Sequence, residues 1–241
     1  MADSSRLGPA LAALSAVTGR RWELGPATNK VSVERGVAVR MRDGAVLLAD
    51  HYAPLTGGPR PTVLMRCPYG RGLFYAMPAV LYAERGYHVL LQSCRGTSGS
   101  GGTFRPYADE AADGQDTVGW LRGQDWFGGR LATVGASYLA YVQWALALDP
   151  PPELRAMVVQ VSPHDLGTAC FGHGPFELYN RLAWSELMAH KERQGPVRWA
   201  WRALHMGKRL APMLSRLPLT ATGAAIGGAG APGRRLLCER R

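Results

Sequence analysis

A serine with the surroundings of a nucleophile stands in the middle of the chain. Leu131–Val134 is an apolar, partly β-branched run that predicts a strand, and Gly135-Ala136-Ser137 is a turn of small residues. Tyr138–Leu148 then has the apolar spacing of a helix. A strand, a sharp turn and a helix form the context in which a serine hydroxyl is exposed beyond a sheet to attack a carbonyl carbon. Ser137 is therefore the candidate nucleophile.

The turn also suits the chemistry that follows such an attack. A strained backbone at Ser137 is tolerated only beside small residues, and Gly135 and Ala136 meet that condition. A helix that begins at Tyr138 directs its first N–H groups and its positive dipole end toward the space where an oxyanion would develop. The alternative is an ordinary Gly/Ala/Ser turn, because Leu139 stands where the G-x-S-x-G pattern has glycine.

The elements that would position this serine alternate along the chain. Expected strands are 31–41, 45–52, 61–66, 87–92, 131–134 and 154–161, and expected helices are 4–24, 73–85, 108–121 and 138–148. Asp43-Gly44 predicts a hairpin between the first two strands. The remaining strands alternate with helices, which predicts an α/β fold with a mainly parallel sheet and an antiparallel hairpin at its front edge. Tyr69, Arg95 and Ser137 follow strand ends, where ligands of such sheets bind.

Composition excludes several other classes of protein. No apolar run reaches the ~18 residues that a membrane span requires, and the N-terminal stretch has no convincing cleavage site of an export signal. Four scattered cysteines give no metal signature and fit buried thiols in a reducing compartment, which predicts a cytoplasmic protein. The net charge of +10 is concentrated in residues 191–241, with 11 Lys/Arg and 2 Asp/Glu. This basic region has no organised nucleic-acid motif, so we expect neither nucleic acid nor membrane as a partner.

Several motifs together resemble the CocE/NonD hydrolases, the cocaine-esterase-like and Xaa-Pro-dipeptidyl-peptidase-like branch of the α/β-hydrolases. They are MRDGAVLLADHYAP at 41–54, RCPYGR at 66–71, QSCRGTSGSGGTFRPYADEAADGQDTVGWL at 92–121 and GASYLAYVQW at 135–144. The resemblance covers roughly residues 31–166 and continues more weakly to about 217. It implies an α/β-hydrolase sheet, incomplete at its C-terminal strands, with the start of a helical cap.

The resemblance also implies roles for individual residues. Ser137 matches the nucleophile of the family motif G-x-S-Y-x-G, whose last glycine is Ala140 here. The backbone N–H of Tyr138 and the phenolic hydroxyl of Tyr69 match the oxyanion hole; without the family, Tyr69 would be interpreted as a tyrosine that packs beside a loop. Arg95 is expected to be a structural anchor, and Ser93 stands where relatives often carry aspartate. A serine mechanism implies no cofactor, and no metal site is expected.

The partners of the serine are not evident in the sequence. A serine hydrolase needs a histidine and an orienting acid, which in α/β-hydrolases follow the serine in the order acid, then histidine. In the resembling family both lie beyond the cap, and residues after Leu217 are rich in Ala, Gly, Pro and Arg without the pattern of a strand. Asp165 and His173 preserve the order, but eight residues give little freedom to reach Ser137. The expectation is therefore the N-terminal part of a serine hydrolase, inactive by itself.

This interpretation divides the chain into four segments and leaves alternatives open. The segments are an N-terminal helix or leader (1–30), the N-terminal part of an α/β-hydrolase core (31–166), a helical cap (167–217) and a disordered or aberrant tail (218–241). A small-molecule ester or amide is the expected substrate, and the oligomeric state cannot be deduced. The alternatives are a non-catalytic binding module with an α/β-hydrolase pocket, a complete small hydrolase that uses Asp165 and His173, and a nucleic-acid binder through the basic tail.

Overall fold

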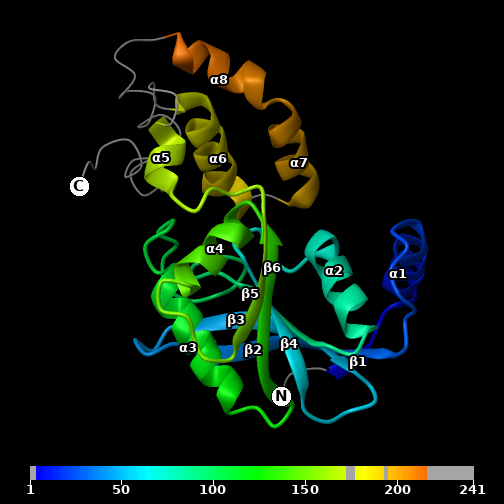
Figure 1. Ribbon diagram of the computed structural model, residues 1–241. Coiled ribbons are helices and arrows are strands. Elements are labelled where there is room, and N and C mark those ends of the chain that lie inside the picture. The colour runs from blue at the N-terminus through cyan, green and yellow to red at the C-terminus, as the bar shows by residue number, and fades with distance from the viewer. Residues whose placement is uncertain (1–3, 172–176, 193–194, 216–241) are drawn as a thin grey trace. The chain divides into compact units, whose positions relative to one another are not determined.

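The structure is a computed structural model that describes residues 4–171, 177–192 and 195–215 (Figure 1). The chain divides into two compact units, residues 1–164 and residues 165–241, which are described separately. The first unit holds the sheet and the candidate nucleophile. None of the helices in the described ranges is long and apolar enough to cross a membrane.

The first unit is built on a seven-stranded mixed sheet. Its strands are β1 (Ser4–Arg6), β2 (Val31–Arg40), β3 (Val46–Pro54), β4 (Arg60–Cys67), β5 (His88–Ser93), β6 (Phe127–Ala136) and β7 (Leu154–Gln160), in the order β1-β2-β3-β5-β4-β6-β7. The first three strands pair antiparallel, as does β3 with β5. All pairs among β5, β4, β6 and β7 are parallel. The predicted α/β fold is confirmed, with an antiparallel hairpin of β2 and β3. The sheet is mixed and not mainly parallel, because β1 and the pairing of β3 with β5 add to its antiparallel part.

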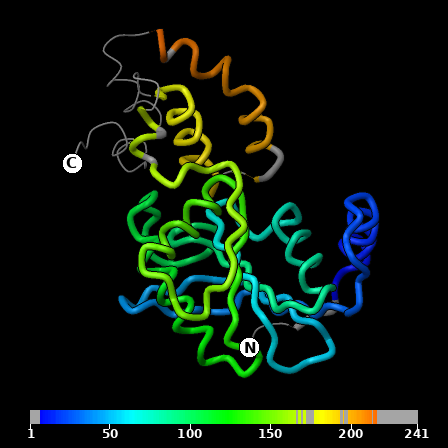
Figure 2. Tube along the Cα trace, in the orientation of Figure 1, coloured from blue at the N-terminus to red at the C-terminus, as the bar shows by residue number. Residues whose placement is uncertain are grey.

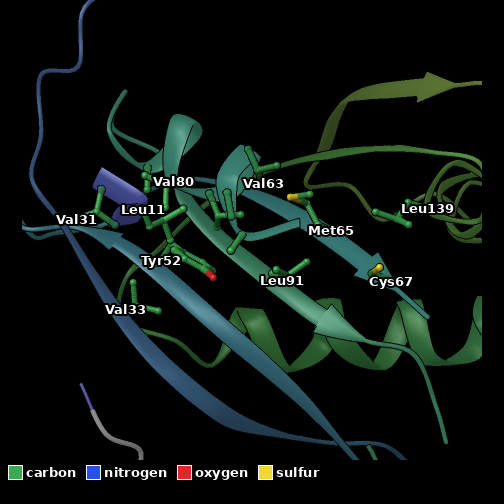
Figure 3. Close-up of a cluster of buried hydrophobic side chains, with 14 residues drawn as sticks. Leu11, Val31, Val33, Tyr52, Val63, Met65, Cys67, Val80, Leu91 and Leu139 are labelled. Atoms are coloured by element: carbon green, nitrogen blue, oxygen red, sulfur yellow. The ribbon is translucent and has the colours of Figure 1, made fainter. Parts of the chain in front are cut away.

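Four helices cover the two faces of this sheet, as the ribbon and the chain trace both show (Figures 1 and 2). They are α1 (Pro9–Arg21), α2 (Leu73–Ala83), α3 (Glu110–Arg122) and α4 (Tyr138–Leu146). One core cluster joins α1 and α2 to the sheet; it is drawn in Figure 3 and includes Leu11, Val80 and Leu91. A second cluster joins α3 and α4 to the opposite face and includes Val118, Leu121 and Leu146. The buried strands are apolar because both faces are covered.

Two elements differ from the sequence-based expectation. The leading helix expected over residues 4–24 was wrong at its start, because residues 4–6 form strand β1, which pairs with β2, and Pro9 begins the helix. Proline is favoured at the first helical position, since its missing N–H has no partner in a helix there. The strand expected over residues 131–134 begins earlier, because Phe127 already belongs to β6 and pairs with Arg60. In both cases pairing with a neighbouring strand extended the sheet into residues with a loop-like sequence.

The second unit is helical where the structure describes it. It contains α5 (Leu166–Phe171), α6 (Leu178–Lys191), α7 (Pro196–Leu204) and α8 (Met206–Leu214). Leu182, Met206 and Leu210 form its buried apolar cluster. The carboxylate of Glu186 on α6 is buried and accepts hydrogen bonds from Arg202 on α7 and Arg209 on α8. A buried charge is stable only when it is paired in this way, so this ion pair network ties the three longer helices together.

Candidate active site

Ser137 lies at a sharp corner between β6 and α4. Its backbone has φ 58° and ψ −122°, a positive φ that a non-glycine residue rarely adopts, and its side chain is exposed. Its backbone N–H donates to the carbonyl oxygen of Gln160 on β7 at 2.9 Å. Its carbonyl oxygen accepts from the N–H groups of Ala140 and Tyr141, which starts the helix. The strained corner is therefore held from both sides while the hydroxyl stays accessible.

The residues around Ser137 explain the absence of larger side chains before it. A Cβ atom at Gly135 would lie 2.2 Å from the Cβ of Leu139, so only glycine allows the helix to turn back this tightly. Ala140 is completely buried at the position of the family's second glycine.

Tyr138 fixes the start of α4 through its buried side chain. Its hydroxyl donates to Glu110 Oε1 at 2.8 Å and accepts from the N–H of Tyr107 at 3.0 Å. Burial, followed by the charge of Glu110, raises the pKa of the Tyr138 phenol well above its ordinary value, so the hydroxyl remains a donor. The phenol of Tyr138 thus anchors the start of α4. The backbone of Tyr138, and not its phenol, is the part that lies next to Ser137.

Tyr69 follows the end of the strand beside the one that carries Ser137. Strands β4 and β6 are parallel neighbours in which Leu64 pairs with Thr133, and each strand ends three residues beyond this pair. Tyr69 comes two residues after β4, half-buried, and packs against the apolar cluster that includes Leu139. Its ring stacks on Tyr75 with 6.0 Å between ring centroids. The topology therefore brings Tyr69 and Ser137 to the same edge of the sheet.

Arg71 holds the loop that carries Tyr69. Its Nε donates to Asp50 Oδ1 at 3.0 Å, and its Nη1 donates to the hydroxyl of Ser93 and to the carbonyl oxygen of Ser98 at 3.2 Å. Asp50 is buried on β3 and also pairs with Arg35 at 3.2 Å. The hydroxyl of Ser93 carries no charge, so Asp50 supplies the negative charge for Arg71.

A second charged network lies beneath the site, and sequence reasoning missed most of it. Arg66 on β4 is only 2% exposed in its side chain and donates to Glu110 at 2.8 Å and to Gln92 at 3.0 Å. Arg95 pairs with Asp113 at 2.6 Å, which confirms the expected structural anchor. The signals available in the sequence were an arginine inside the apolar run 61–67 and acidic residues at 110 and 113, in the first turn of a helix.

In the described part of the first unit, none of the three histidines is hydrogen-bonded to Ser137. His51 and His88 are buried and bonded to each other, with Nε2 and Nδ1 3.0 Å apart, and His51 stacks on Trp126. His164 lies edge-on to Trp144, with ring centroids 6.4 Å apart. In the second unit, Asp165 accepts from the N–H of Gly167 at 2.8 Å and from Thr168. His173, its proposed partner, lies outside the described residues.

The buried histidine pair predicts acid-sensitive folding. Burial, and then the nearby His88, lower the pKa of His51 from 6.5 to about 3. Below pH 6.5 the unfolded chain therefore binds a proton that the folded chain does not, and stability falls by about 1.4 kcal/mol per pH unit until about pH 3. Urea unfolding at pH 7 and pH 5 should show about 2 kcal/mol more loss in the wild type than in His51→Phe. Equal losses in the two proteins would contradict this assignment.

The residues that the structure describes hold no group of three or more His, Cys, Asp or Glu suited to a metal ion. The chemistry available at the corner is that of an exposed serine beside a helix start, with Tyr69 at the same edge of the sheet. Such an arrangement can attack a carbonyl carbon and donate hydrogen bonds to the oxygen that becomes charged.

Comparison with known proteins shows the family of this chain. The family model of X-Pro dipeptidyl-peptidases (S15 family) matches residues 43–221, which is more than half of the chain. The chain belongs to the X-Pro dipeptidyl-peptidase (S15) family. Cocaine esterase from Rhodococcus sp. (strain MB1 Bresler) is 34% identical over 165 residues, which cover 65% of this chain and 29% of that protein. The resemblance to CocE/NonD hydrolases is confirmed.

The fold of this chain is similar to that of a solved structure. An aminopeptidase from the marine sediment archaeon Thaumarchaeota archaeon aligns with a TM-score of 0.54 and 24% identity, over 67% of this chain and 30% of that chain. A CocE/NonD family hydrolase from Staphylococcus aureus is 28% identical, with a TM-score of 0.49, over 53% of this chain and 27% of that chain. The chain thus spans less than a third of the length of these three proteins.

Proposed function

We propose that this chain carries the nucleophile and the oxyanion hole of a serine hydrolase that cleaves acyl esters or amides, with Ser137 as the nucleophile. The observation that carries the proposal is the backbone of Ser137, which has a positive φ at the junction of β6 and α4 and leaves the side chain exposed. A serine gains nothing in stability from such a conformation, so the strain is best explained by a use for the exposed hydroxyl.

The reaction follows from the groups at the corner. The Oγ of Ser137 attacks the acyl carbonyl carbon as its proton passes to a base, and the electron pair of the carbonyl moves onto its oxygen. The backbone N–H of Tyr138 and the hydroxyl of Tyr69 donate to that oxyanion, and the positive end of α4 adds to its stabilisation. When the carbonyl re-forms, the alcohol or amine leaves with a proton, and water then releases the acid from Ser137 by the same steps.

The base and its orienting acid are proposed to come from outside the first unit. Its three histidines are His51 and His88, which bind each other, and His164, which lies beside Trp144. We therefore expect little turnover from residues 1–164, and little from the chain unless its second unit supplies a histidine. The two-unit organisation fits a core segment and a helical segment in which substrate selection would reside, as proposed for residues 31–166 and 167–217.

The proposed substrates are small molecules with an acyl ester or amide bond. The relatives include a protein called cocaine esterase, and the family model describes X-Pro dipeptidyl-peptidases. An oxyanion hole serves both reactions, because ester and amide cleavage pass through the same tetrahedral arrangement.

An activated ester with added imidazole tests this proposal. Imidazole can replace a missing histidine, so release of 4-nitrophenol from 4-nitrophenyl acetate should be slow with the wild type alone and faster with imidazole. The additional release that imidazole causes in the wild type should disappear in Ser137→Ala. This variant also measures how fast imidazole alone hydrolyses the ester. Identical rates for the two proteins with and without imidazole would contradict Ser137 as the nucleophile. Fast release without imidazole that depends on Ser137 would contradict only the proposed origin of the base.

Removal of the Tyr69 hydroxyl should weaken the oxyanion hole. Loss of one donor typically costs about 10²-fold in rate, so Tyr69→Phe should lower the Ser137-dependent release of 4-nitrophenol by about 10². Tyr75→Phe is a matched control, because the Tyr75 ring stacks on Tyr69 and also loses only a hydroxyl. If both variants lose the same activity, the hydroxyl of Tyr69 acts through packing and the proposed donor role is wrong.

A further inference from the structure

Gln143 is a polar residue in the apolar helix α4, and its side chain is buried, with the residue only 2% exposed. Its Oε1 accepts from the hydroxyl of Thr133 on β6 at 2.8 Å. Its Nε2 lies 3.0 Å from the carbonyl oxygen of Leu139, 3.2 Å from that of Val158 and 3.4 Å from that of Gly135. One carboxamide thus contacts the end of β6, the start of α4 and the adjacent strand β7.

These contacts surround the strained serine. Gly135 stands two residues before Ser137 and Leu139 two residues after it, and Nε2 of Gln143 donates to the carbonyl oxygens of both. The link therefore spans the corner on its buried side, while the hydroxyl of Ser137 lies on the exposed side. The orientation of the carboxamide is fixed by the three carbonyl oxygens, which can only accept and therefore face the nitrogen. The oxygen is then turned toward Thr133, whose hydroxyl donates to it.

We propose that Gln143 is a positioning residue that holds the corner in the conformation that exposes the Ser137 hydroxyl. The inference rests on the proposed function, in which Ser137 is the nucleophile. Without the carboxamide, the end of β6 and the start of α4 lose their shared partner, and Ser137 can relax toward a negative φ that withdraws its hydroxyl. A glutamine that only satisfied buried carbonyl oxygens would support stability without any coupling to the conformation of Ser137.

A double-mutant cycle separates these roles without relying on turnover. Glycine accepts a positive φ, so Ser137→Gly should raise the melting temperature of the wild type by about 3 °C by relieving strain. The Gln143→Met variant already has a relaxed corner. When Ser137→Gly is added to it, the gain in melting temperature should fall to less than about 1 °C. Thr133→Val is the milder second variant, because it leaves Gln143 in place and removes only one hydrogen bond of its carboxamide. The gain in melting temperature from Ser137→Gly should fall there by at least a third.

Thr117→Val is the matched control for this cycle. Thr117 is as buried as Thr133 and donates to Gln92 at 3.0 Å and to the carbonyl oxygen of Asp113 at 2.7 Å, in the network of α3. The full gain from Ser137→Gly should remain in this background. Equal gains in every background that folds, or no gain in the wild type, would overturn the role of Gln143.

The reactivity of Ser137 gives the second readout. With a fluorophosphonate probe, Gln143→Met should form the Ser137 adduct about tenfold more slowly than the wild type, and Thr117→Val should react at the wild-type rate. An unchanged rate in Gln143→Met would also overturn the proposal. Failure of the wild type to form any adduct at Ser137 would instead contradict the proposed function, while the melting temperatures would still report on the link between Gln143 and the corner.

Discussion

Replacement of Arg66 by methionine should lower the free energy of unfolding by about 3–5 kcal/mol, because removal of one partner leaves buried charges uncompensated. Arg66 Nη2 lies 2.8 Å from Glu110 and 3.9 Å from Asp113, and the side chains of both acids are at most 4% exposed. Methionine keeps the apolar volume of the arginine stem but leaves the buried carboxylate of Glu110 without its cation, while Asp113 keeps its pair with Arg95. The hydroxyl of Tyr138 also binds Glu110, so the start of α4 should loosen as well.

Urea unfolding measures this loss, with Arg122→Met as the control. Arg122 pairs with Glu153 at 2.7 Å, but its side chain is half exposed, and exposed pairs contribute at most about 1 kcal/mol. The two variants therefore have the same substitution, arginine to methionine, and differ in how deeply the ion pair is buried. Losses of similar size in the two variants would show that Arg66 does not neutralise a buried network.

Gly135→Ala should lower the free energy of unfolding by about 3 kcal/mol, because a new methyl group has no space at the corner. The added Cβ would lie 2.2 Å from the Cβ of Leu139, which belongs to the rigid first turn of α4 and cannot rotate away. The corner must open to accept the methyl group. We therefore expect Ser137 to lose its reactivity in any Gly135→Ala protein that folds.

Gly119→Ala is the opposite case and serves as the control. Gly119 lies inside α3, and a Cβ there would meet nothing within 4 Å. Alanine in a helix is favoured over glycine by roughly 0.5–1 kcal/mol, so this variant should be slightly more stable than the wild type in the same urea titration. If Gly135→Ala were as well tolerated as Gly119→Ala, the tight contact between the strand end and Leu139 would be wrong.

The fold could be predicted from the sequence where local signals were strong. The Asp43-Gly44 hairpin and the apolar runs of β4 and β5 carry their structure in their own residues, and these elements were confirmed. Strand β1 and the first residues of β6 could not be found in this way, because they are strands only through pairing with β2 and with Arg60. Short edge pairings depend on partners far away in the sequence, which periodicity does not report.

The candidate site divides in the same way. The corner at Ser137 was predictable because small residues between a strand and a helix are a local pattern. Gln143 and Arg66 were not recognised, since each acts through residues brought together by the fold, such as Val158 and Glu110. The pairing of His51 with His88 likewise depends on the register between β3 and β5. The sequence signal available for these residues was a charged or polar residue inside an apolar run. Such a residue indicates a buried hydrogen-bonded network and not a surface position.

Mass spectrometry of the chain after reaction with a fluorophosphonate probe tests the central claim most directly. Trypsin releases residues 131–155 as one peptide, in which Ser137 is the single serine. We predict an adduct on Ser137 that forms faster with added imidazole, and no adduct on this peptide in Ser137→Ala. An unmodified peptide under all conditions, or modification that persists in Ser137→Ala, would contradict the assignment of Ser137 as the nucleophile.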